Sequence, residues 1–198
     1  MNVDENVFFR EATVRICSSL DIETALRRSF EYIRNFIPMM RMSLHILDPD
    51  LNVLRFVASA GSDPQEDTER VLRLPEKGRN ERAAWFKNRE VIRIMNQPDP
   101  KLGVPEIRQS LGLKPDISAM NMALKLEGNS IGDLALAADG LNQYTDEHAR
   151  LLLLLHEPFA IAMSNALKHQ EVIRFKDMLA DDNRYLFDEL RSALGDEI

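Results

Sequence analysis

The stretch that decides the fold runs from residue 131 to residue 167 and contains Ile131-Gly-Asp-Leu-Ala-Leu136, Tyr144-Thr-Asp-Glu-His-Ala-Arg-Leu-Leu152 and Ala160-Ile-Ala-Met-Ser-Asn-Ala-Leu167. The first segment is apolar and favours a β-strand. In the second segment, Thr145 can cap a helix whose first turn contains two acidic residues. Pro158 lies between the second and third segments, so the long helix is predicted to kink or divide there.

The sequence before this stretch indicates paired strands. Residues 117–126 and 131–138 are predicted to form a hairpin across Glu127-Gly-Asn-Ser130. An earlier hairpin joins the alternating residues 42–47 to the β-rich run 53–60. Hairpins therefore outnumber crossover connections, which predicts an α+β fold with a mainly antiparallel sheet and helices against a face.

Two amphipathic helices precede these strands. The first has apolar residues at three- and four-residue steps from Phe8 to Leu20. Asp21 can cap the second, whose apolar stripe runs from Ile22 to Ile37 before Pro38. The remaining predicted elements are short strands at 71–74 and 91–95, a short helix at 80–88, and one helical turn near 107–111.

Composition limits the classes of function. The chain has 198 residues, of which 44% are hydrophobic and 29% charged, enough for one domain with a substantial core and an extension. The formal net charge of −7 opposes a nucleic-acid-binding surface. The acidic N-terminus does not resemble a signal peptide, and the longest apolar run, Leu151 to Leu155, is too short to span a membrane. We therefore expect a cytoplasmic protein with no direct nucleic-acid or membrane partner.

The order of elements and the segments quoted above resemble a GAF domain over roughly residues 5–172. Val71-Leu-Arg-Leu-Pro75 and Glu90-Val-Ile-Arg93 are similar to the middle of that family. The resemblance implies a GAF-like, PAS-related sheet with the N- and C-terminal helices on one face and loops and short helices on the other. It also divides the chain into a sensory domain at 1–172 and a linker helix at 173–198.

The tail has a second resemblance. Leu179-Ala-Asp-Asp-Asn-Arg-Tyr-Leu-Phe-Asp-Glu-Leu-Arg191 is similar to the linker helix before the ATPase module of NtrC/NifA-class enhancer-binding activators, which work with an alternative sigma factor. This resemblance implies a bacterial transcriptional activator with ATPase and DNA-binding domains in its full-length form. The chain has no phosphate-binding Gly-x-x-x-x-Gly-Lys-Ser/Thr motif, so this part of the protein is not expected to hydrolyse ATP.

A GAF domain implies a pocket between the sheet and the segments that cover it, with an unknown small-molecule effector. The residues placed there are His45, Trp85, Arg93, Met120 and Met122. Arg93 could pair with an anionic ligand, or it could be an ordinary exposed strand residue. For His45 a solvated or hydrogen-bonded strand histidine is the simpler interpretation, and for the methionines core packing is. The cofactor stays unknown, and no residue is identified as catalytic or as a metal ligand.

The tail also contains a heptad. Val172, Leu179 and Leu186 fall at seven-residue steps, and Asn183 and Leu190 occupy the other seam of that register. This pattern predicts a homodimer, whereas a single amphipathic helix folded onto its own domain is the simpler alternative. The sequence thus predicts a sensory domain that is not an enzyme. A ligand-free dimerisation and protein-docking module is the other candidate.

The single cysteine, Cys17, lies on the first predicted helix among apolar neighbours. A redox switch or a tetrapyrrole attachment site is conceivable there. A buried, inert thiol is the simpler expectation.

Overall fold

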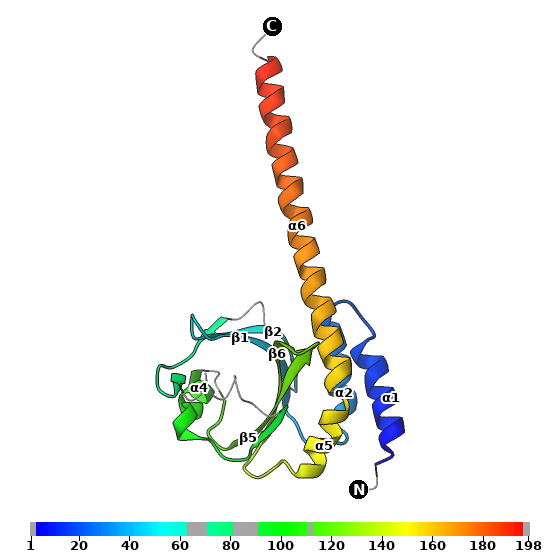
Figure 1. Ribbon diagram of the computed structural model, residues 1–198, viewed down its shortest axis with the longest axis vertical. Helices are drawn as coiled ribbons and strands as arrows, with labels where there is room; N and C mark the ends of the chain where they lie inside the picture. The colour runs from blue at the N-terminus through cyan, green and yellow to red at the C-terminus, as the bar shows by residue number, and fades with distance from the viewer. Residues whose placement is uncertain (1–2, 63–70, 81–90, 111–112, 196–198) are drawn as a thin grey trace.

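The computed structural model describes residues 3–62, 71–80, 91–110 and 113–195. Its centre is a six-stranded sheet in the order β3-β2-β1-β6-β5-β4, and all neighbouring strands pair antiparallel. The strands are β1 (Arg41–Asp48), β2 (Val53–Gly61), β3 (Val71–Arg73), β4 (Ile92–Met95), β5 (Ile117–Leu126) and β6 (Asn129–Asp139). The predicted α+β class and antiparallel sheet are confirmed, with helices against the sheet as Figure 1 shows.

The two hairpins form where turn residues permit them. The β5–β6 hairpin turns through Glu127 and Gly128, which both have positive φ, at 50° and 82°. Two successive positive φ values are typical of a type I′ turn, whose twist matches that of the flanking strands. Leu126 pairs with Asn129 as a result, so β6 begins two residues earlier than predicted.

Four helices lie on one face of the sheet (Figure 1): α1 (Glu5–Ile16), α2 (Ile22–Ile33), α5 (Asp146–Leu154) and the start of α6 (His156–Gly195). Asp4, Asp21 and Thr145 cap the first three, and each side chain accepts hydrogen bonds from backbone N–H groups of the first turn. The buried core lies between these helices and the strand residues that point toward them. Burial of this apolar surface is the main force that holds the layers together.

The opposite face is covered differently. The short 3-10 helix η1 (Pro100–Leu102) and α4 (Val104–Ser110) lie on that side of the sheet (Figure 1). The predicted helix at 80–88 falls almost entirely outside the described residues.

The C-terminal helical region divides, as Pro158 predicted. Leu155 has φ −95° and ψ 5°, which ends α5, and α6 begins at the next residue. Pro158 then lies in the first turn of α6, where a missing N–H breaks no helical hydrogen bond. The helix continues for 40 residues and projects beyond the body of the molecule (Figure 1).

Cys17 departs from the expected inert core position. It is the C-cap residue that follows α1 and is exposed, whereas Ile16, the last residue of the helix, is buried. Among the described residues, no helix is long and apolar enough to cross a membrane.

Candidate ligand-binding site

A cavity of about 180 Å³ lies between the face of the sheet that points away from the long helices and the covering segment of η1 and α4. The wall is mainly apolar and includes Leu47, Leu54 and Phe56 from β1 and β2. Ile107 and Leu113 close it from the covering segment. A concave, mostly apolar site with a few polar groups is the usual form of a small-molecule site.

Strand alternation selects which residues reach this cavity. In β5, Ala119 and Asn121 line it, whereas Met120 and Met122 point to the helix side and are fully buried in the core. The sequence-based choice of Met120 and Met122 as pocket residues is therefore corrected. A one-residue step along a strand changes the face, and the two methionines fill space beneath the helices instead.

His45 and Arg93, in contrast, both line the cavity. Trp85, the remaining predicted pocket residue, lies outside the described residues. His45 is buried, and its ring meets that of Phe56 edge to face at a centroid distance of 4.6 Å. Burial lowers the pKa of His45 to about 4, since the imidazolium form loses its hydration there. The ring is therefore neutral near pH 7.

Three arginines and one aspartate provide the charge of the cavity wall. Arg41, Arg93 and Arg108 line it together with Asp133, whose backbone pairs in register with His45. The Nη2 atom of Arg93 lies 3.7 Å from Oδ2 of Asp99, a partly exposed ion pair. Such pairs are worth little in solvent.

Arg108 is the most deeply buried of the three arginines, with 4% of its surface exposed. Its Nη1 atom donates to the backbone oxygen of Pro115 at 2.9 Å. Its Nη2 atom is buried and finds no hydrogen-bond acceptor among the described residues. Burial lowers the pKa of Arg108 from its usual value, although a guanidinium remains charged in proteins.

Sequence reasoning did not identify Arg108 or Asp133. Asp133 left a signal, because it interrupts the apolar run Ile131-Gly-Asp-Leu-Ala-Leu136. An acidic residue in a central strand needs a polar destination. Arg108 left no such signal, since an arginine in a short polar helix is ordinarily exposed.

Gly132 connects the cavity to the long helix. A Cβ atom at this position would lie 2.4 Å from the backbone oxygen of His45 and 2.4 Å from Cε of Met163 on α6. The helix therefore packs against the sheet one residue away from Asp133, which lines the cavity on the other face. At the start of α6, Nε2 of His156 accepts a hydrogen bond from the backbone N–H of Lys125 on β5, at 3.3 Å.

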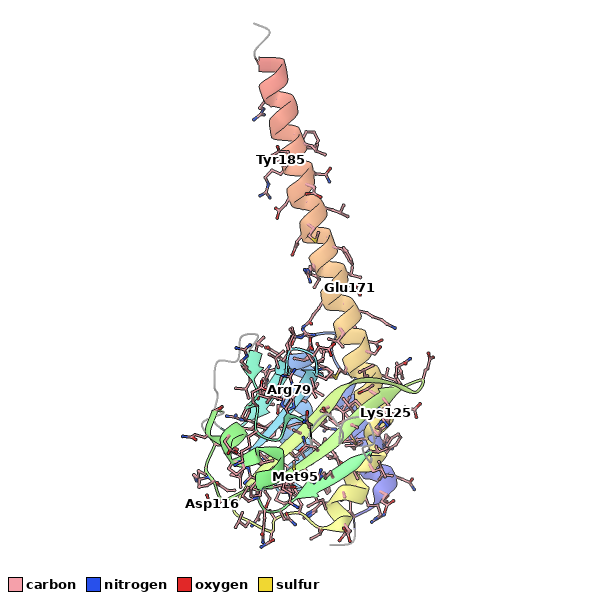
Figure 2. All side chains as sticks on the ribbon, turned by 60° about the vertical axis from the view of Figure 1, so that its left-hand side comes forward. Arg79, Met95, Asp116, Lys125, Glu171 and Tyr185 are labelled. Carbon is pink, nitrogen blue, oxygen red and sulfur yellow. The ribbon has the colours of Figure 1, made fainter. Side chains whose placement is uncertain are left out.

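The tail of α6 stands apart from the other elements. Residues 169–187 are all exposed, and Figure 2 shows the side chains beyond Glu171, including Tyr185, with no other element beside them. The predicted seam residues Val172, Leu179 and Leu186 are 64%, 63% and 53% exposed. Asn183 is also exposed, and the side chain of Leu190 lies outside the described part. The alternative of a tail folded onto its own domain does not match this arrangement.

Solved structures share the architecture. The GAF domain of a phosphoenolpyruvate-protein phosphotransferase from Coxiella burnetii is 16% identical and has a TM-score of 0.65, covering 85% of this chain and 97% of its own. A phycoerythrobilin-bound GAF domain from a cyanobacterial phytochrome is 14% identical, with a TM-score of 0.59 and coverage of 85% and 99%. The chain therefore has the GAF fold, as the sequence resemblance implied.

A particular regulator is similar in sequence. The formate hydrogenlyase transcriptional activator of Salmonella typhimurium, in strains SL1344 and LT2, is 26% identical over 211 residues, which cover 97% of this chain. The match spans 29% of those relatives' length. No protein-family model matches the chain. The resemblance to a GAF domain of a transcriptional activator, drawn from the sequence, is thus confirmed.

Proposed function

We propose that this chain is the sensory region of a bacterial, cytoplasmic enhancer-binding activator, with a GAF domain at 1–172 and a linker helix at 173–198. A small-molecule signal binds in the cavity. The signal alters the pairing or phase of two linker helices, which control ATPase and DNA-binding domains elsewhere in the full-length protein. The role is regulatory rather than enzymatic.

The observation that best supports this proposal is the projecting, apolar tail of α6. Val172, Phe175, Leu179 and Leu186 together expose large apolar side chains on a helix with no neighbour in the described structure. Contiguous exposed apolar surface on a soluble chain usually marks an interaction site. Seven-residue spacing favours a second helix of the same kind as the partner.

Sedimentation-velocity ultracentrifugation of the purified chain tests the dimer. We expect a homodimer that is lost when Leu179 and Leu186 are both replaced by Gln, because two polar side chains then replace the seam contacts. The matched control replaces Met178 and Tyr185 by Gln. Those positions precede the seam residues by one and are 53% and 68% exposed, so the same chemical change lies off the seam. A monomeric wild type, or equal effects of the two double variants, would contradict the proposed seam.

Native mass spectrometry of the same sample tests the sensor. A dimer with an additional small mass supports a bound signal. A ligand-free dimer that also binds nothing in a metabolite screen would favour the alternative, a dimerisation and protein-docking module. The apolar cavity beside buried polar groups favours the sensor.

A further inference from the structure

We propose that the outer side of the helical layer is a second contact between two copies of this chain. This surface, called the outer helical face, consists of exposed residues of α1 and of the first part of α6: Val7, Arg10, Val14, Cys17, Ile161 and Asn165. The inference rests on the proposed homodimer and assigns to it a surface that the linker-helix seam does not include.

Helix α1 has two opposite faces. The inner face is buried in the core and consists of Phe8, Ala12 and Ile16. The outer face follows steps of three, four and three residues and consists of the exposed Val7, Arg10, Val14 and the C-cap Cys17. Such spacing presents one side of a helix to a second helix. Two apolar β-branched residues stand on this outer side, since Val7 is 45% exposed and Val14 62%.

The exposed line of α6 leads directly into the predicted seam. On the inner side of this helix, Phe159 and Met163 are buried in the core. On the outer side, exposed residues follow steps of four, three and four residues: Ile161, Asn165, Lys168 and Val172. Ile161 is 41% exposed although it lies beside the body of the domain. The surface that a partner helix covers at Val172 therefore continues along the body as far as Ile161.

The two parts of the outer helical face are neighbours in space. Helix α1 contacts α2 and α6, and Figure 1 shows it on the side of the helical layer that points away from the sheet. An ion pair between Glu5 and Arg150 also joins the start of α1 to α5. The buried residues of α1 and α6 belong to one core, so the exposed residues of both helices point away from that core. The outer helical face is thus a single surface.

The linker-helix seam alone is small for a stable dimer. Residues 169–187 are the exposed tail of the described helix. Roughly half of them, about ten a side, can face a partner helix, whereas a standard interface has about 20–30 residues a side. A two-fold axis along the seam brings the same surface of both copies together, because such a pairing is isologous. The outer helical face continues the seam and supplies the remaining area, and its partner is therefore a second copy of this chain.

Sedimentation equilibrium of the purified 198-residue chain over a concentration series tests this surface. The face variant Val14→Gln/Ile161→Gln replaces two exposed apolar side chains by polar ones, so circular dichroism should show an unchanged fold. We expect its dimer dissociation constant to rise about 10-fold or more. The matched control Leu51→Gln/Val71→Gln makes the same kind of change on the β1–β2 turn and on β3, where the residues are 66% and 59% exposed. This control should dimerise like the wild type.

Cys17 gives a direct readout of the same surface, because it is the single cysteine of the chain and is exposed in the protomer. Its labelling by N-ethylmaleimide is followed by mass spectrometry well below and well above the dimer dissociation constant. We expect the rate constant for labelling to fall about 10-fold or more in the dimer, since a covered thiol is less accessible. In the face variant at the same concentrations, the rate constant should stay near that of the monomer.

The outcomes separate the outer helical face from the linker-helix seam. An unchanged dissociation constant in the face variant, or a Cys17 that reacts equally fast in monomer and dimer, would overturn the outer helical face and leave the seam in place. A dimer that survives Leu179→Gln/Leu186→Gln but is weakened in the face variant would support the outer helical face and contradict the seam. A wild-type chain that stays monomeric at every concentration would overturn both.

Discussion

Acid should destabilise this protein through one buried imidazole. His45 lies in the wall of the cavity against Phe56, and burial lowers its pKa from 6.5 to about 4. Above pH 6.5 the ring is neutral in both the folded and the unfolded chain. As the pH falls below 6.5, the unfolded chain takes up a proton that the folded chain does not accept until about pH 4, so the free energy of unfolding decreases.

The magnitude follows from the two pKa values. Each unit of pKa difference corresponds to about 1.4 kcal/mol. Between pH 7.5 and pH 5, a change from 6.5 to about 4 removes about 2 kcal/mol of stability. This amount is a substantial fraction of the roughly 5–15 kcal/mol that stabilises a typical domain.

Urea denaturation at pH 7.5 and pH 5, followed by circular dichroism, measures this loss in the wild type and in His45→Gln. Glutamine stays neutral over this range, so the variant should lose about 2 kcal/mol less than the wild type on acidification. Burial also lowers the pKa of His148, but this contribution is common to both proteins and cancels. His169→Gln, the same substitution at an exposed position of α6, is the matched control.

Equal losses in the wild type and in His45→Gln would refute the reasoning. That result would mean that the folded chain accommodates an imidazolium at this position. Asp133, which pairs in register with His45 and lines the same cavity, is the group that could stabilise it. The variant Asp133→Asn would then restore the predicted loss and identify the cause.

Two backbone positions give further predictions. Gly132→Ala should lower the free energy of unfolding by about 1–3 kcal/mol in urea denaturation, because its Cβ would meet the backbone oxygen of His45 as well as Met163. Met163→Ala in the same chain should recover only part of this loss. A neutral effect of Gly132→Ala would show that the sheet and α6 separate freely here. Asn52 has φ 52°, and its Nδ2 donates to the buried backbone oxygen of Leu74 at 2.9 Å. Asn52→Ala should therefore lower the free energy of unfolding by about 2 kcal/mol. Asn52→Gly should lower it less, since glycine adopts the backbone conformation but does not restore the hydrogen bond. Equal costs for the two Asn52 variants would assign the whole effect to the hydrogen bond.

The layers of the fold could be predicted because they depend on local patterns. Asp21 and Thr145 cap helices where a short polar side chain precedes an apolar periodicity, and the structure shows both caps. Pro158 predicted that the C-terminal helical region divides, because a residue without a backbone N–H is tolerated in the first turn of a helix. The apolar pattern that runs to Leu20 did not show that the helix ends at Ile16, and Leu20 is exposed beyond that end.

The cavity could be predicted only in part, because successive side chains of a strand point to opposite faces of the sheet. His45 and Arg93 were placed by strand assignment alone, and both line the cavity. Met120 and Met122 are one residue from Asn121, which does line it, and no local signal shows which face of a central strand is apolar core when both faces are covered. Arg108 reaches the cavity through the tertiary position of α4, which the sequence of that short helix does not encode by itself.

The geometry of Gly132 bears on how a signal in the cavity could reach the tail. The backbone oxygen of His45 and Cε of Met163 both lie 2.4 Å from the position of a Cβ atom at this glycine, and the adjacent Asp133 lines the cavity. A ligand that moves β1 or β6 therefore changes the surface on which α6 rests. The helix is rigid and rises about 1.5 Å per residue, so its far end at Gly195 lies about 48 Å from Met163. A tilt of about 5° at that contact would displace the end sideways by about 4 Å. A small movement of the sheet at Gly132 would thus be enough to displace the end of α6, and no large rearrangement of the domain is needed.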